Sequence, residues 1–448
     1  MNFQFCFKNG KSRISFFSLN WDFEEHYRSL SFHECKLPLF FHILKSHVRK
    51  FRKRIKQYGI KTDASEFFTQ PKKKYKCRAL FAKMDLNPDV IDESVMGCVC
   101  QPADTANITR VIALKSGVPK SVPAYTVHRN CASGFESITQ ASDKINADRG
   151  SVYLSGGTEN MTQAPFLYRS SAVDKFTKLS KCRTFRDRLH TILSFRPKDF
   201  APIISLRLGL SDVTVGMNMG ETAELIARES GVTRYHQDKF ALESHLKAFV
   251  AIEKMSSEIS PFYFADGTFV DADNGIRGEQ SMGALEKLKP VFDRKQGTVT
   301  AGNASQITDG AVSLLIADEN AVKQNNWNPL GRISAYAYAG CDPERMGLGP
   351  VYAIQKVCEE TGYKLDDFDL IEVNEAFAAQ VLAVCKQLKK TTDLGEVDIA
   401  KLNVNGGAIA LGHPVGSSGS RIALTTLKEL ERRGGKRALI SLCIGGGQ

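Results

Sequence analysis

Hydrophobic runs and helical periods alternate from about residue 85 to the end of the chain. The pattern predicts strands at 91–99, 121–127 and 151–157, and helices at 107–117 and 135–145. The strand at 121–127 reads as buried, and residues 310–318 are expected to form a strand that closes a first half. Because strands alternate with helices, the chain is predicted to form a layered α/β sheet.

The second half of the chain repeats this order. It contains a predicted strand at 402–407, a loop around His413, a helix at 417–432 and a strand at 439–445. Two similar halves predict that Cys131 and His413 lie at the starts of facing helices. A turn and a strand at 365–373 are expected to lead into Asn374.

These patterns divide the chain into parts. We expect an atypical basic segment at 1–75, a first half at 76–320 with a loop domain at about 160–275, and a second half at 321–448. Within the loop domain, residues 175–208 mix basic and apolar side chains. This mixture suits either an amphipathic element on an anionic membrane surface or a solvated helix that covers the active site.

Composition excludes several classes of protein. The 448 residues exceed one average core, 42% of them are hydrophobic, and no apolar run is long enough to span a bilayer. The net charge of +11 resides in the first 84 residues, which hold 19 Lys and Arg against 6 Asp and Glu, so nucleic-acid binding is not expected. Eleven cysteines without a paired framework or a secretory signal indicate a reducing compartment.

One cysteine lies where a strand turns into a helix. Cys131 is followed by Ala132, Ser133 and Gly134, which leave room for an acyl group on the sulfur. The N–H groups at a helix start favour a thiolate, so Cys131 is a candidate nucleophile. A buried structural cysteine explains this stretch, taken alone, equally well.

Four short stretches recur in the order of a known family. They are Cys-Ala-Ser at 131–133, Val-Asn-Glu-Ala-Phe at 373–377, Ala-Leu-Gly-His-Pro-Val-Gly at 410–416, and Ser-Leu-Cys-Ile-Gly-Gly-Gly at 441–447. Together with Ala-Gly-Asn-Ala-Ser at 301–305, they resemble the fingerprints of the thiolase family. The resemblance implies two duplicated βαβαβαββ halves in a five-layer αβαβα arrangement with an inserted loop domain.

The resemblance also implies a role for each site residue. Cys131 attacks a 3-ketoacyl-CoA and becomes acylated, His413 takes the thiol proton, and Cys443 is the second acid and base. Asn374 holds a water that forms one oxyanion hole with His413, while the N–H groups of Cys131 and Gly445 form the other. Glu375 is expected to orient its neighbours rather than to transfer protons.

Ligands and partners follow from the same resemblance. Ser305 matches a contact to the pantetheine arm of CoA and Arg277 a residue near the nucleotide end. CoA is a substrate, and neither a metal nor a cofactor is expected. The family implies a homodimer or tetramer, in the bacterial cytoplasm or the mitochondrial matrix. The insert is similar to that of the thiolase subunit in fatty-acid oxidation complexes, which implies a hydratase and dehydrogenase α subunit and long acyl chains.

Three departures from the family leave other functions open. No Arg-Thr-Pro segment occurs in residues 1–75, so the first strand is expected to be absent or atypical, and the chain stops at Gln448 where the family adds a last strand. A shifted reading frame or a truncated gene would explain both. Oxidation-complex thiolases carry His where Asn374 stands, so acyl length stays open. The alternatives are a ketosynthase of the same fold and a catalytically impaired protein that binds acyl-CoA.

Overall fold

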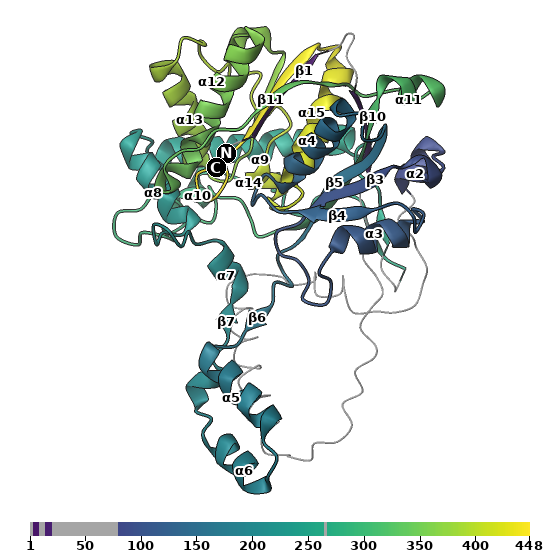
Figure 1. Ribbon diagram of the computed structural model, residues 1–448. Helices are drawn as coiled ribbons and strands as arrows, with labels where there is room; N and C mark the ends of the chain where they lie inside the picture. The colour runs from purple at the N-terminus through teal and green to yellow at the C-terminus, as the bar shows by residue number, and fades with distance from the viewer. Residues whose placement is uncertain (1–2, 9–13, 20–78, 264–266) are drawn as a thin grey trace. The chain divides into compact units, whose positions relative to one another are not determined.

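The computed structural model describes residues 3–8, 14–19, 79–263 and 267–448 (Figure 1). Most of the basic segment predicted at 1–75 therefore lies outside the described residues, and so does most of the charge that it carries. No helix in the described part of the chain is long and apolar enough to cross a membrane.

The first sheet has the strand order β2-β10-β5-β3-β4. Its strands are β2 (Ile14–Leu19), β10 (Asp309–Asp318), β5 (Val152–Asn160), β3 (Glu93–Gly97) and β4 (Ala124–Val127). β3 pairs in parallel with β4 and β5, while β10 is antiparallel to β5 and β2. The prediction that the strand before Cys131 is buried is wrong, because β4 lies at the sheet edge and its four residues are half-buried.

The second sheet has the strand order β11-β1-β13-β12. Its strands are β11 (Ile333–Ala337), β1 (Phe3–Lys8), β13 (Arg437–Leu442) and β12 (Leu370–Val373). β1 is antiparallel to both of its neighbours, and β12 is parallel to β13. The first strand, expected to be absent or atypical, is therefore present, and it lacks the Arg-Thr-Pro segment of the family. Phe3, Phe5 and Phe7 alternate with Gln4, Cys6 and Lys8, which is the period of a strand.

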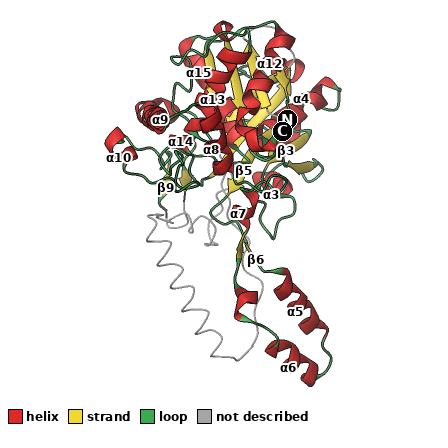
Figure 2. Ribbon diagram, turned by 90° about the vertical axis from the view of Figure 1, so that its left-hand side faces the viewer, coloured by secondary structure: helices red, strands yellow, loops and turns green. Residues whose placement is uncertain are grey.

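Helices separate and cover the two sheets (Figures 1 and 2). Two helices, α4 (Ser133–Asn146) and α15 (Ser418–Arg433), lie between the sheets and pack against each other within one apolar core. On the outer faces, α3 (Ile108–Ser116) covers the first sheet, and α12 (Gly349–Thr361) and α13 (Ala378–Thr391) cover the second. The predicted five-layer α/β arrangement is confirmed.

Glycines allow the two halves to touch backbone to backbone. A Cβ on Gly419 of α15 would lie 2.5 Å from the amide nitrogen of Phe135 in α4. A Cβ on Gly157 would lie 2.2 Å from the carbonyl oxygen of Gly416, and one on Gly97 would lie 2.5 Å from the same atom. No side chain fits at these positions, so the loops that follow the strands of both halves meet at Gly416.

The inserted region contains short elements and one long helix. The short ones are β6 (Phe166–Leu167), α5 (Ser170–Lys181), α6 (Phe185–Leu193), β7 (Ile203–Ile204), α7 (Ser205–Gly209), α8 (Met219–Glu229), β8 (Phe262–Tyr263), β9 (Phe269–Val270) and α10 (Met282–Glu286). The long helix is α9 (Arg234–Met255). Outside the insert lie α2 (Ala79–Met84), α11 (Glu319–Gln324) and α14 (Ala408–Leu411).

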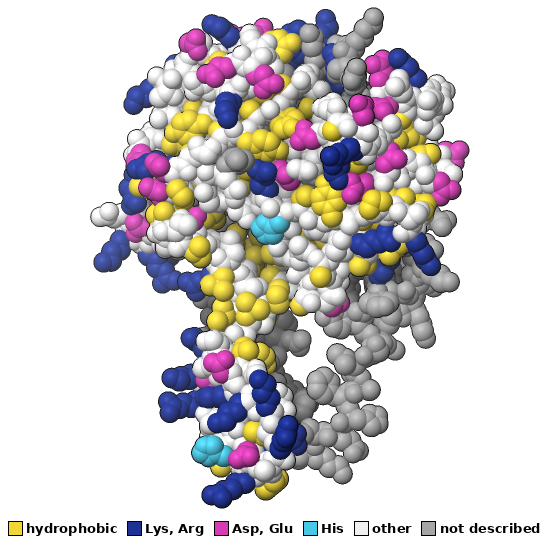
Figure 3. All heavy atoms as spheres, viewed as in Figure 1, with side chains coloured by type: hydrophobic (Ala, Val, Ile, Leu, Met, Phe, Trp, Pro, Cys, Tyr) yellow, Lys and Arg dark blue, Asp and Glu magenta, His cyan; other side chains and the backbone are white. Residues whose placement is uncertain are grey.

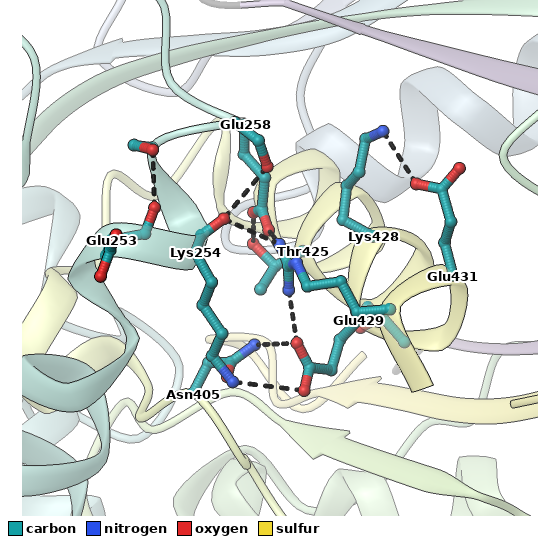
Figure 4. A network of polar contacts seen from close by, with 12 residues as sticks. Glu253, Lys254, Glu258, Asn405, Thr425, Lys428, Glu429 and Glu431 are labelled. Carbon is teal, nitrogen blue, oxygen red and sulfur yellow. Dashed lines mark hydrogen bonds and ion pairs between the residues drawn. The ribbon is translucent and has the colours of Figure 1, made fainter. Parts of the chain in front are cut away.

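A polar network fixes the end of α9 to the second half (Figure 4). The buried carboxylate of Glu429 on α15 accepts hydrogen bonds from Lys254 Nζ at 3.3 Å and from Asn405 Nδ2 at 3.1 Å. Thr425 Oγ1 donates to Glu258 Oε2 at 2.8 Å, and Arg432 pairs with both carboxylates. Because these carboxylates are buried and paired, the network holds α9 rigidly against α15.

Candidate active site

A tight turn presents Cys131 at the start of α4. The N–H of Ala132 donates to Arg129 O and that of Ser133 to Asn130 O, both at 3.0 Å. Asn130 adopts a left-handed conformation with φ of 42°, which Asn tolerates better than most residues. Its Nδ2 donates to the carbonyl oxygen of Gly445 at 2.8 Å. The turn before the nucleophile is thus tied to the glycine loop of the second half.

Two backbone groups act on the Cys131 sulfur. The N–H groups of Gly445 and of Cys131 itself both lower the pKa of the thiol. Burial is the larger effect, and it raises this pKa to about 11. The N–H groups thus favour the thiolate as expected, but desolvation outweighs them. Cys131 is a thiol at neutral pH and needs a base.

Cys443 lies directly after β13 and is 1% exposed. Burial raises the pKa of its thiol well above the ordinary value, and the nearby Cys131 raises it further. A charge on one sulfur thus acts on the other, which indicates that the two thiols lie near each other. Two residues further on, Gly445 supplies the N–H that faces Cys131.

The side chain of His413 is held by a hydroxyl. Its Nδ1 lies 2.6 Å from Ser418 Oγ, and that hydroxyl donates to Pro414 O at 3.0 Å. Since the hydroxyl proton is used by Pro414, Nδ1 must carry the proton of the imidazole and donate to Ser418. Nε2 then has a lone pair, and it has no hydrogen-bond partner among the described residues.

Burial, followed by the charge of Arg421, lowers the pKa of His413 to about 4. The imidazole is therefore neutral at physiological pH and able to accept a proton at Nε2. The N–H of His413 donates to Thr308 Oγ1 at 3.2 Å, which fixes the loop from the first half. A neutral, oriented imidazole suits general-base chemistry.

Asn374 is 2% exposed, yet neither its Oδ1 nor its Nδ2 has a partner within the described residues. Its backbone is fixed, because its N–H donates to Ser441 O on β13 at 3.0 Å. Buried amides are rarely left unpaired without a functional reason. Such a group, like the Nε2 of His413, is able to bind a water or a polarised carbonyl oxygen.

The remaining predicted residues differ in how firmly the structure ties them to this site. The N–H of Ser305 donates to Ala376 O at 3.0 Å, so its loop pairs with the loop that follows Asn374. The side chain of Asn303 anchors that loop by accepting from the N–H of Thr300 at 2.8 Å. Arg277 is exposed, and its N–H donates to His245 Nδ1 at 3.3 Å, while its carbonyl oxygen accepts the N–H of Gln280 at 3.2 Å. Neither contact joins Arg277 to the other site residues.

The strand predicted at 402–407 does not form. Isolated bridges replace it, Ile371 with Leu402 and Val404 with Gly406. The backbone is left-handed at Asn403, with φ of 44°, and at Gly406, with φ of 72°, so it cannot continue as a strand.

Sequence reasoning missed one buried carboxylate behind the site. Glu159 is 3% exposed and accepts hydrogen bonds from the N–H groups of Cys100 at 2.8 Å and Gly416 at 2.7 Å. It thus joins the loop after β3 to the loop that carries His413. Its position at the end of β5, after Gly156 and Gly157, was the available signal, because loops at strand ends often carry functional residues.

Comparisons with known proteins agree with this geometry. Residues 73–320 match the family model "Thiolase, N-terminal domain" and residues 327–448 match "Thiolase, C-terminal domain". The chain is 41% identical over 393 residues to the mitochondrial 3-ketoacyl-CoA thiolase of Homo sapiens, which covers 86% of this chain and 90% of the relative. It is also 41% identical over 376 residues to the acetyl-CoA acetyltransferase of Escherichia coli, covering 83% and 89%.

Comparison with solved structures indicates the same family. The human mitochondrial 3-ketoacyl-CoA thiolase in complex with CoA superposes with a TM-score of 0.72 at 40% identity, covering 84% of this chain and 88% of the other. The Bacillus anthracis acetyl-CoA acetyltransferase has a TM-score of 0.73 at 35% identity, covering 82% and 87%. With both family models matched and relatives about 40% identical over most of its length, the chain belongs to the thiolase family.

Proposed function

We propose that this thiolase cleaves a 3-ketoacyl-CoA with CoA, giving acetyl-CoA and a shortened acyl-CoA, and catalyses the reverse Claisen condensation. The observation that carries the proposal is the link between the nucleophile turn and the Gly445 loop, because Asn130 Nδ2 donates to Gly445 O at 2.8 Å and the N–H groups of Cys131 and Gly445 both lower the pKa of the Cys131 thiol. An oxyanion that forms on a carbon bonded to this sulfur lies within reach of both donors.

In the first half-reaction, Nε2 of His413 takes the proton of the Cys131 thiol. The sulfur attacks the C3 ketone, and the N–H groups of Cys131 and Gly445 stabilise the resulting oxyanion. The C2–C3 bond then breaks, and the electron pair moves onto the acetyl-CoA fragment as an enolate. Asn374, through a water, and His413 stabilise its oxygen while the Cys443 thiol protonates C2.

In the second half-reaction, the Cys443 thiolate removes the proton from an incoming CoA thiol. The CoA sulfur attacks the acyl group on Cys131, and the oxyanion again lies against the N–H groups of Cys131 and Gly445. Collapse of this intermediate breaks the bond to Cys131, releases the shortened acyl-CoA and returns the proton to the Cys131 sulfur. CoA is a substrate here, and the protons balance: His413 returns to Cys131 the proton that it took, and Cys443 regains from CoA the proton that it gave to C2.

Purified protein tests the proposal when it is mixed with acetoacetyl-CoA and CoA. Loss of the 3-ketothioester absorbance, with acetyl-CoA as product, is the expected result. Cys131→Ser should abolish this reaction and leave CoA binding intact in calorimetry. If wild type and variant are folded, bind CoA and are equally inert, the protein is an acyl-CoA-binding relative. Decarboxylation of malonyl-CoA without thiolysis would instead identify a ketosynthase.

For CoA itself, we propose that Ser305 contacts the pantetheine arm and Arg277 the nucleotide end. Ser305 lies next to the Asn374 loop, and the exposed guanidinium of Arg277 is free to meet phosphate from solvent. Ser305→Ala and Arg277→Ala should each raise the KM for CoA by several-fold and leave kcat nearly unchanged. A lower kcat at an unchanged KM would contradict these assignments. We place this reaction in the mitochondrial matrix or the bacterial cytoplasm.

We also propose a homodimer or tetramer, in which β4 contributes to the contact between copies. β4 is a half-buried edge strand that pairs with β3 on one side, and an edge strand is a ready site for pairing with another copy. Analytical ultracentrifugation should give twice or four times the chain mass. A monomer at micromolar concentration would refute this.

The pair of helices α5 and α6 is proposed to contact an anionic membrane surface. Along α6, Phe185, Leu189, Ile192 and Leu193 recur at helical spacing and are 81%, 46%, 52% and 75% exposed. Lys and Arg side chains are numerous on the part of the surface that contains α5 and α6 (Figure 3). Such a helix lies flat in a lipid interface.

Vesicles that contain anionic lipid should sediment the protein, and the double change Phe185→Ser with Leu193→Ser should abolish this sedimentation. Capture by a hydratase and dehydrogenase α subunit, without lipid binding, would assign the surface to that partner.

A further inference from the structure

The residue after Asn374 has a carboxylate that is fully engaged in the interior. Glu375 is 1% exposed and accepts hydrogen bonds from Asn403 Nδ2 at 2.8 Å, Ser244 Oγ at 2.6 Å and the N–H of Ile409 at 3.2 Å. A Cβ on Gly407 would lie 2.3 Å from its carboxyl carbon, so a glycine is needed beside it. A buried carboxylate with three donors is rigid, and it fixes the backbone of Asn374.

Ser244, on α9, contributes more than one of these bonds. While its hydroxyl donates to Glu375, the same oxygen accepts the N–H of Gly407 at 3.1 Å. Gly407 precedes α14, the short helix that leads to His413. The carbonyl oxygen of Ser244 lies 2.4 Å from a Cβ built on Gly406. A single buried serine thus lies against both loops that carry Asn374 and His413.

The two loops differ in how else they are held. His413 has direct supports of its own, from Ser418 on Nδ1 and from Thr308 on its N–H. Asn374 is held by its backbone N–H, which donates to Ser441 O at 3.0 Å, but its side-chain amide has no hydrogen-bond partner among the described residues. Loss of the Ser244 hydroxyl should therefore displace Asn374 more than His413. The helix that carries Ser244 is itself anchored. Its end is tied to α15 through Glu429 and Glu258 (Figure 4).

From this arrangement we infer that Ser244 is a positioning residue, which sets the Asn374 oxyanion site through Glu375. The inference rests on the proposed function. Loss of this positioning role should affect one step of the reaction and spare another, whereas a general structural defect would affect both steps alike. Carbon–carbon bond cleavage develops an enolate oxygen at Asn374, whereas acyl exchange between CoA thioesters develops its oxyanion at the N–H groups of Cys131 and Gly445.

The experiment compares these two reactions in one enzyme. Thiolysis of acetoacetyl-CoA measures cleavage, and transfer of the acetyl group from acetyl-CoA to isotopically labelled CoA measures exchange. Ser244→Ala should lower kcat for thiolysis by roughly tenfold or more, because misplacement of a catalytic group by about 1 Å is costly. Exchange should fall less than about threefold, and the KM for CoA should change less than about twofold, since neither uses Asn374.

A matched control removes another buried hydroxyl. Ser116 Oγ donates to Ile112 O at 2.8 Å within α3, on the outer layer, and Ser116→Ala should leave the ratio of thiolysis to exchange unchanged. If Ser244→Ala does not fold, Glu375→Gln keeps the side-chain volume and should shift the ratio in the same direction. An equal loss of both reactions, or no loss, overturns the positioning role. Wild type that catalyses neither reaction overturns the proposed function instead.

Discussion

Gly157→Ala should force apart the two halves of the protein behind the active site. The added Cβ would lie 2.2 Å from the carbonyl oxygen of Gly416 and 2.7 Å from the Cα of Ser417, where 3.4 Å is an ordinary contact. Both opposing atoms belong to the backbone, so a gap of about 1.2 Å must open between β5 and the His413 loop. Overpacking of this kind costs about 1–3 kcal/mol, and the absence of a flexible side chain places this case at the upper end.

The same displacement should reduce activity, because it moves His413 away from Cys131. A shift of about 1 Å lowers a rate by on the order of 10²-fold. Urea denaturation followed by circular dichroism measures the first effect and thiolysis of acetoacetyl-CoA measures the second. Gly283→Ala is the matched control, since no atom lies within 4 Å of the added Cβ and an alanine in α10 should stabilise by about 0.5–1 kcal/mol. A Gly157→Ala protein with wild-type midpoint and rate would refute the steric reasoning.

Three further predictions follow from single side chains. Ser418→Ala removes the acceptor of His413 Nδ1 and should lower kcat about tenfold and alter the pH profile of kcat, while Ser418→Thr should restore much of it. Because burial lowers the pKa of His413 to about 4, its contribution to stability is complete above about pH 6.5 and is lost as the pH falls toward 4. This contribution to the free energy of unfolding is about 3 kcal/mol. As the pH falls from about 6.5 to 4, the urea midpoint of His413→Asn should therefore fall less steeply than that of the wild type. Asn303→Ala should lower the free energy of unfolding by about 2–3 kcal/mol, because the Thr300 N–H and the Asp238 carboxylate lose their hydrogen-bond partner. The same change should raise the KM for CoA, and an unchanged KM would contradict this.

The parts of the fold that depend on neighbouring residues could be predicted from sequence. Asn107 caps α3 by accepting the N–H of Arg110, and Gly117 ends it at φ of 93°, as the composition of that stretch indicates. The alternation of strands and helices likewise gave the layered sheets. β1 was missed although its phenylalanines alternate, because the segment is short and its sheet partners, β11 and β13, lie more than 300 residues away.

The site divides in the same way. Motif resemblance pointed to Cys131, His413, Cys443 and Asn374, and to an orienting role for Glu375, while the partners through which such groups act could be found only in three dimensions. Ser244 and Glu375 are 131 positions apart, and Glu159 and Gly416 are 257 apart. No period or spacing relates such pairs. The thiol pKa of Cys131 was misjudged for a related reason, because the extent of burial depends on how both halves close around the sulfur.

The meeting of the two halves at Gly416 has a consequence for how the protein matures. The nucleophile comes from the first half, and the imidazole, the second thiol and the amide all come from the second. A nascent or misfolded chain whose halves have not docked lacks the base and the oxyanion donor Gly445, so it leaves the cellular pool of acyl-CoA untouched. Turnover therefore requires that the two halves have docked, and an activity assay reports on that docking.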